Sequence, residues 1–179
     1  MRHTLLLAAA AAIAGCGGAT HTATETQTQP AAPRPATTTS APTPTVTTSS
    51  GPACQGGACA ARVVAGHGFT ANPTFDPSRN LNVLLGVRTG SADGTAQQAF
   101  FFWHGRYIGT DTSDISAGIR LASQTDDTAT LVYRLYNPQD PQCCSTAGQA
   151  TVRYRYDGSR LVPLDPIPPS SSTERSSRR

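Results

Sequence analysis

The central part of the chain alternates hydrophobic and polar residues in short runs, the pattern of half-buried β-strands. Leu81, Val83, Leu85 and Val87 share one face of a predicted strand over residues 81–88. Similar alternation, or a dense run of β-branched and aromatic residues, predicts further strands. These cover residues 97–103, 106–111, 128–136, 150–156 and 160–164. Because the connections between consecutive strands are short, we expect an antiparallel meander.

Turn signals support this interpretation. Only His104-Gly105 separates two predicted strands, which predicts a two-residue hairpin in which His104 takes a positive φ. Asp157-Gly158 is the strongest hairpin signal in the chain, and Asp126-Asp127 precedes another strand at a predicted turn. Helical signals are few: residues 59–66 are small and apolar, and residues 113–123 place Ile115 and Ile119 at helical spacing. The predicted fold class is therefore mainly β, with α+β as the alternative and at most one or two short helices.

One predicted strand carries aromatic residues at consecutive positions: Phe100, Phe101, Phe102 and Trp103. Since side chains on a strand alternate between faces, both faces of this strand are bulky and apolar. The simpler interpretation is a central strand covered on both sides. The alternative is that one face, with Tyr107 beside it, lines an apolar groove for a ligand or partner.

The N-terminus has the parts of an export signal: Arg2, an apolar run over residues 5–13, and small residues before Cys16. The run is too short for a permanent transmembrane helix. Its Ile-Ala-Gly-Cys ending resembles a bacterial lipobox, which implies cleavage after residue 15 and lipidation of Cys16. Two or three acyl chains give stable membrane anchoring. We therefore expect a protein anchored by lipid to the extracytoplasmic face of the cell membrane.

Composition then divides the chain. Residues 16–50 combine the lipidated cysteine with a stalk rich in Thr, Pro and Ala, which buries too little apolar surface to fold. Residues 51–167 form the predicted β domain, and residues 168–179 a disordered C-terminal tail rich in Ser and Arg. Between residues 54 and 166 there are nine Arg and nine Asp, without Lys or Glu. A neutral domain without a basic stripe argues against nucleic-acid binding.

The predicted domain contains four cysteines: Cys54, Cys59, Cys143 and Cys144. An even number in an exported domain predicts disulfides. Because a bond between adjacent residues would strain the intervening peptide, we expect Cys54 and Cys59 each to pair with one of the later two. Each such bond would stabilise the folded domain by roughly 4 kcal/mol. The competing interpretation, a zinc site, lacks the usual C-x2-C spacing, so we expect neither a metal nor a cofactor.

Catalytic signatures are absent from the sequence. His67 and His104 have no nucleophile or metal-binding motif beside them, and Asp111 and Asp114 lack the further ligands of a calcium loop. Arg153 and Arg155 lie on the polar side of a predicted strand. We interpret them as a solvated strand face, with a small anion site as the alternative.

Together these features resemble the LppP/LprE family of actinobacterial lipoproteins. The likeness lies in the aromatic-His-Gly-Arg-Tyr-Ile-Gly-Thr stretch of residues 101–110 and the Tyr-Arg-Tyr-Asp-Gly segment of residues 154–158. Segments 130–134 and 164–168 contribute to it. The resemblance spans roughly residues 54–168 and implies location and anchoring, with no activity and no catalytic residue to transfer.

Three hypotheses about function follow from the sequence. The first is a non-enzymatic envelope module that binds another envelope component, a protein or a glycan. The second is a carrier of an apolar ligand, a lipid or glycolipid, that uses the strand of residues 100–103. An enzyme is the third and least favoured. Lipid anchoring predicts the membrane as one partner, and the sequence does not identify the others.

Overall fold

The computed structural model describes residues 52–179. The predicted signal peptide over residues 1–15, the lipidation of Cys16 and the stalk over residues 16–50 lie outside the described residues. No helix in the part that is described is long and apolar enough to cross a membrane. The elements follow in the order α1 (Gly57–Gly66), β1 (Phe69–Ala71), β2 (Leu81–Arg88), β3 (Gln97–Trp103), β4 (Arg106–Thr110), β5 (Ile119–Gln124), β6 (Thr128–Arg134), β7 (Gln149–Tyr156) and β8 (Leu161–Pro163).

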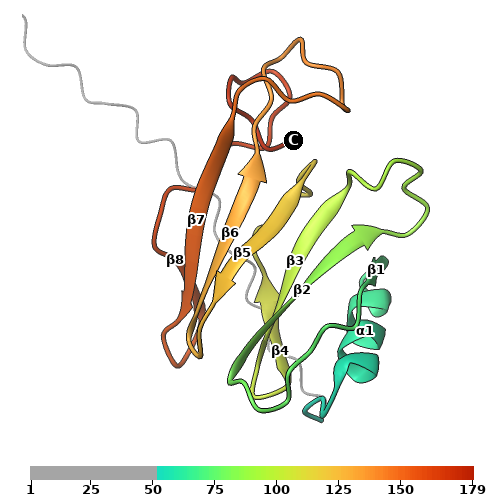
Figure 1. The fold of residues 1–179 in the computed structure, drawn as a ribbon, viewed down its shortest axis with the longest axis vertical. Coiled ribbons are helices and arrows are strands. Elements are labelled where there is room, and N and C mark those ends of the chain that lie inside the picture. The colour runs from blue at the N-terminus through green and yellow to red at the C-terminus, as the bar shows by residue number, and fades with distance from the viewer. Residues whose placement is uncertain (1–51) are drawn as a thin grey trace, which may run out of the picture. The chain divides into compact units, whose positions relative to one another are not determined.

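The strands form two antiparallel sheets of four, ordered β1-β2-β3-β4 and β5-β6-β7-β8 (Figure 1). Within each sheet, strands that are consecutive in sequence are therefore paired neighbours, and the predicted mainly β meander is confirmed. Six predicted strands correspond to β2, β3, β4, β6, β7 and β8, and the segment 59–66 lies in α1. The turn between β3 and β4 is also as predicted, with φ of 46° at His104 and 76° at Gly105.

Two parts of the secondary structure were not predicted correctly. The helix expected over residues 113–123 is wrong, because Ile119 begins β5 and pairs with Tyr133 of β6. Gly118 disfavours a helix there, and the edge of β6 offers a ladder of hydrogen bonds that local spacing cannot reveal. Strand β1 is only three residues long and was missed.

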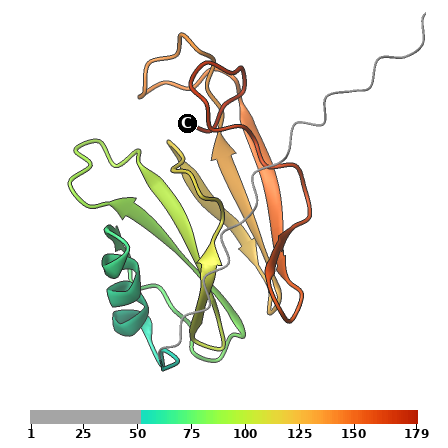
Figure 2. The same ribbon diagram turned by 180° about the vertical axis from the view of Figure 1, so that it is seen from behind.

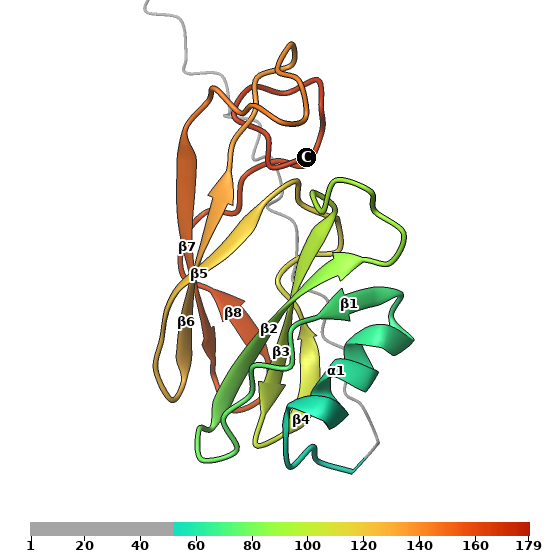
Figure 3. The same cartoon turned by 45° about the vertical axis from the view of Figure 1, so that its right-hand side comes forward.

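The two sheets and the helix form three layers (Figure 3). One face of β2 and β3 packs against the sheet β5–β8 in a core that includes Leu81, Phe101, Leu131 and Tyr154. The opposite face packs against α1, through Phe100, Phe102, Ala60, Val64 and others. The sheet β1–β4 is therefore covered on both faces, as its two-sided apolar sequence requires.

This arrangement settles where the aromatic strand lies. Phe100, Phe101 and Phe102 are fully buried, and Tyr107 is 6% exposed. Phe100 and Phe102 face the helix layer, while Phe101 faces the second sheet, where its ring centroid is 5.4 Å from that of Tyr154. The central-strand interpretation therefore describes the structure, and these rings present no open apolar face.

The predicted disulfide pairing is wrong. Cys54 is bonded to Cys59, and Cys143 is bonded to its neighbour Cys144. The physical reason is placement. The backbone N–H of Cys54 donates to Gly105 in the β3–β4 turn, whereas Cys143 and Cys144 lie in the β6–β7 loop at the opposite end of the strands (Figure 1). Cys54–Cys59 therefore ties the segment before α1 to the first turn of that helix, and Cys143–Cys144 lies within the β6–β7 loop, so neither bond joins the start of the domain to a late loop.

The C-terminal segment is also different from the prediction of a disordered tail over residues 168–179. Figure 2 shows it folding back beside the β6–β7 loop. Ser177 forms a β-bridge with Tyr136, and the carbonyl of Arg178 accepts a hydrogen bond from the backbone of Ala117 at 2.8 Å. The side chain of Arg178 is completely buried and donates to the carbonyl of Pro168 and the hydroxyl of Ser116. The polar composition of residues 168–179 does not predict this packing, because arginine side chains are rarely fully buried.

A polar cluster lies inside the core between the sheets. The carboxyl of Asp111 is fully buried and accepts hydrogen bonds from the Tyr133 hydroxyl at 2.7 Å and the Ala99 amide at 2.9 Å. Tyr133 in turn shares a hydrogen bond of 2.8 Å with Tyr154. Burial raises the pKa of Asp111 to about 6, although these hydrogen bonds oppose the shift. The residue is therefore a buried structural acid, not a candidate calcium ligand.

This raised pKa gives the domain a distinct pH dependence. Between about pH 4 and pH 6 the folded domain keeps a proton on Asp111 that the unfolded chain has lost. Its free energy of unfolding should therefore fall by about 2–3 kcal/mol as pH rises through this window. Asp111→Asn should remove that slope in urea unfolding experiments at several pH values. Asp157→Asn is the matched control, because the pKa of Asp157 is lowered to about 2 by hydrogen bonds from Arg160 and Ser159. An unchanged slope in Asp111→Asn would contradict the assignment.

Candidate functional site

The outer face of the sheet β5–β8 is polar and carries arginines. Arg120 of β5 pairs with Val132 of β6, and Val132 pairs with Thr151 of β7, so these three side chains share a face. Arg134 follows two residues after Val132 and lies on the same face. Arg120 and Arg134 are both exposed. The opposite face of these strands is the one buried in the core.

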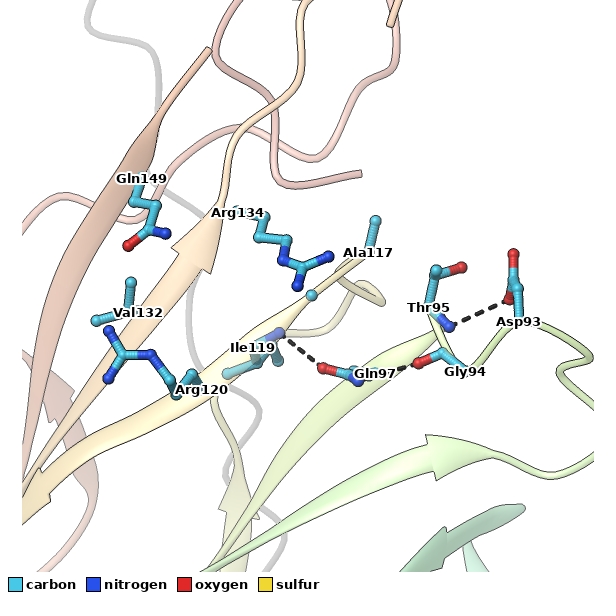
Figure 4. A pocket seen from close by; sticks show the side chains of 11 residues that line it. Asp93, Gly94, Thr95, Gln97, Ala117, Ile119, Arg120, Val132, Arg134 and Gln149 are labelled. Carbon is cyan, nitrogen blue, oxygen red and sulfur yellow. Dashed lines mark hydrogen bonds between the residues drawn. The ribbon is translucent and has the colours of Figure 1, made fainter. Parts of the chain in front are cut away.

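A cleft of about 340 Å³ opens where this face meets the loop between β2 and β3. Figure 4 shows Arg120, Val132, Arg134 and Gln149 on one side of the cleft and the loop residues Asp93 and Thr95 on the other. Gln97 joins the two sides, because its amide accepts a hydrogen bond from the backbone of Ile119 at 2.7 Å and donates to Gly94 at 3.0 Å. The cleft therefore lies between the two sheets and is built from both.

Gly118 determines how Arg134 lies in this cleft. The backbone amide of Arg134 donates to the carbonyl of Gly118 at 3.0 Å. The aliphatic stem of Arg134 then passes directly over Gly118, where a Cβ atom would lie only 2.9 Å from Cδ of the arginine. The absence of a side chain at residue 118 thus lets the guanidinium of Arg134 extend along the cleft wall.

The cleft arginines differ from Arg153 of the same sheet in their partners. Among the described residues, no carboxylate forms an ion pair with Arg120 or Arg134. By contrast, the guanidinium of Arg153 makes two hydrogen bonds of 2.8 Å to the carboxylate of Asp165. Asp165 therefore balances the charge of Arg153, which disfavours the anion site considered for Arg153 and Arg155.

A second depression, of about 330 Å³, contains Arg79 and Asp76. Their nitrogen and oxygen atoms are 3.9 Å apart, so this depression holds a balanced pair. The arginine cleft holds two cations and one carboxylate, that of Asp93. Hydrogen bonds from Thr95 and Ser91 lower the pKa of Asp93, which keeps it ionised within its own loop. The net charge of the cleft is therefore positive, with guanidinium groups available for an anion.

The structure places the sequence-predicted residues elsewhere. Phe100, Phe101, Phe102 and Tyr107 lie in the two cores, and burial raises the pKa of Tyr107 to about 12. Trp103 is partly exposed, with its ring centroid 4.7 Å from that of Tyr156. None of these five residues lines the arginine cleft or the second depression.

Sequence reasoning missed the cleft for an identifiable reason. Arg120 falls inside the segment 113–123, whose spacing predicts a helix, and a helix at this position does not pair Arg120 with Val132 as the observed strand does. The signal that could have revealed it is the alternation of Ile119, Arg120 and Leu121, which fits a half-buried strand as well as a helix.

The fold and the cleft define a small domain of two antiparallel sheets with a helix on one face and a polar, cationic cleft on its surface. The sequence model of the LppP/LprE lipoprotein family matches residues 73–159, so this segment of the chain is similar to that family. The match indicates a lipoprotein and hence membrane association. The matched segment includes every residue that lines the cleft. No curated protein and no solved structure matches the chain.

Proposed function

We propose that this protein is a lipid-anchored envelope lipoprotein that binds an anionic envelope glycan without catalysing a reaction. The anchor is Cys16, and the binding site is the arginine cleft. The observation that carries the proposal is the pair of exposed guanidinium groups, Arg120 and Arg134, which lack carboxylate partners in the described part of the chain.

Guanidinium groups suit such a ligand because each presents several N–H donors in a plane that matches a carboxylate or a phosphate. The amide of Gln149 lies beside them and can bond to sugar hydroxyls. Apolar groups in the cleft are few, chiefly Val132 and Ile119. This chemistry favours an acidic sugar over a lipid chain, and the buried rings of β3 disfavour the apolar-ligand alternative.

Isothermal titration calorimetry tests the proposal. The full chain, carrying Cys16→Ser to prevent acylation, is titrated with polygalacturonate as a carboxylate polymer, with polyphosphate as a phosphate polymer, and with neutral dextran. We expect binding to at least one acidic polymer, weakened by salt, and none to dextran. Arg120→Gln and Arg134→Gln should each weaken binding about tenfold or more, since a hydrogen bond to a charged group contributes about 1.5–3 kcal/mol.

Arg62→Gln is the matched control. Arg62 is exposed on α1, in the layer on the far side of the sheet β1–β4. The Arg62→Gln substitution removes the same positive charge outside the cleft, so the affinity for the acidic polymer should stay close to that of the parent protein. Equal losses in all three variants would mean that binding depends only on overall charge, and the proposal would then be wrong. Binding only to an acidic protein partner would overturn the choice of a glycan.

A further inference from the structure

The two disulfides lie in opposite environments. Cys54 is 5% exposed and packs in the core beneath α1, and Cys59 packs against the same cluster. Cys143 and Cys144 are both exposed in the β6–β7 loop. Because thiol–disulfide exchange requires a thiolate to reach a sulfur atom, access separates the two bonds. An attacking thiolate has access to the Cys143–Cys144 bond and is hindered at the other.

The loop that carries Cys143 and Cys144 keeps its shape through contacts that do not involve sulfur. The carboxylate of Asp140 accepts hydrogen bonds from the backbone amides of Asn137 and Thr146, each at 2.8 Å, and from the Thr146 hydroxyl at 2.6 Å. The carbonyl of Gln142 accepts a hydrogen bond from Tyr136 at 3.1 Å. These bonds hold the loop on both sides of the cysteine pair, so opening the disulfide need not unfold the strands.

We infer that Cys143–Cys144 is a redox-reactive site that dithiol reductants open in the folded protein, while Cys54–Cys59 stays closed as a structural bond. In the first step, one thiolate of the dithiol attacks one sulfur and forms a mixed disulfide, and the other cysteine leaves as a thiolate that takes up a proton. In the second step, the remaining thiolate of the dithiol displaces the second cysteine. The protein gains two electrons and two protons, and the dithiol is oxidised to its disulfide.

The loop also touches the arginine cleft. The amide of Gln142, next to Cys143, donates to the hydroxyl of Thr95 at 3.0 Å, and Thr95 lines the cleft. Opening the disulfide releases Cys143, the residue after Gln142, from the covalent ring that it forms with Cys144. The backbone amide of Thr95 should therefore report the redox state in an NMR spectrum, whether or not the cleft binds a glycan.

Differential alkylation tests the inference on the full chain with Cys16→Ser. The folded protein is incubated with limiting dithiothreitol, quenched with iodoacetamide and mapped by peptide mass spectrometry. We expect Cys143 and Cys144 to be alkylated at least about tenfold faster than Cys54 and Cys59, as access controls the rate. Circular dichroism should show that the strands persist after this first reduction.

Two variants complete the test. The double change Cys143→Ser and Cys144→Ser should fold and take up no iodoacetamide under the same conditions. The double change Cys54→Ser and Cys59→Ser should keep the rapid reduction at residues 143 and 144. Opening of both bonds at one rate, earlier opening of Cys54–Cys59, or a peptide map that links Cys54 or Cys59 to residue 143 or 144 would each overturn the inference.

Discussion

Phe101→Ala should destabilise the domain by about 3–5 kcal/mol, because a fully buried ring is removed from a close-packed interior. The side chain is 0% exposed and lies in the core between the sheets, against Tyr154. A domain of this size has a total stability of about 5–15 kcal/mol, so the variant should approach unfolding at ambient temperature. Urea unfolding followed by circular dichroism measures the loss.

The matched control is Leu164→Ala. Leu164 is the one large hydrophobic residue in the described part of the chain that is clearly exposed, at 39%. Its truncation should change the free energy of unfolding by no more than about 0.5 kcal/mol. A loss below about 1 kcal/mol for Phe101→Ala would instead mean that this ring is exposed in solution, and the assignment of β3 as a central strand would then be wrong.

Arg178→Ala should lower the free energy of unfolding by about 3 kcal/mol and release the C-terminal segment. The guanidinium is fully buried and donates to Pro168, Asp114 and Ser116, so truncation leaves the buried acceptors of Pro168 and Ser116 without their donor. The amide of Ala117 should also lose protection from hydrogen exchange, since it donates to the carbonyl of Arg178. Urea unfolding and hydrogen exchange give the two readouts.

Arg175→Ala is the control for the same segment. Arg175 is exposed three residues before Arg178, and its truncation should change stability by less than about 0.5 kcal/mol. If Arg178→Ala destabilised the domain no more than this control does, the segment would be a mobile tail in solution. The prediction made from sequence composition would then be the correct one.

The strands could largely be predicted because their signals are local. Alternating residues in β2 and β7, the His104-Gly105 turn and the Asp157-Gly158 hairpin each specify their own structure within about ten residues. Strand β5 could not be predicted in this way. Its residues fit a helix and a strand equally well, and the deciding factor is the free edge of β6, which is a tertiary feature.

The disulfide pairing and the arginine cleft could not be predicted from the sequence for a related reason. Which cysteines meet depends on which ends of the strands their loops occupy, and the chain order of Cys54 and Cys143 does not contain that information. The same holds for Arg120 and Arg134, which become neighbours of Thr95 only when the two sheets pack. The anion site suggested for Arg153 and Arg155 is disfavoured by a contact that the sequence does not reveal, because Asp165 pairs with Arg153.

NMR mapping of the bound polymer tests the central claim most directly. The full chain with Cys16→Ser is labelled with ¹⁵N and titrated with short polygalacturonate and polyphosphate fragments. The account predicts that the largest amide shifts cluster around the cleft, at Thr95, Arg120, Arg134 and Gln149, and disappear in Arg134→Gln. Shifts centred on another surface, such as the exposed Arg62 of α1, or no shifts with either polymer, would contradict it.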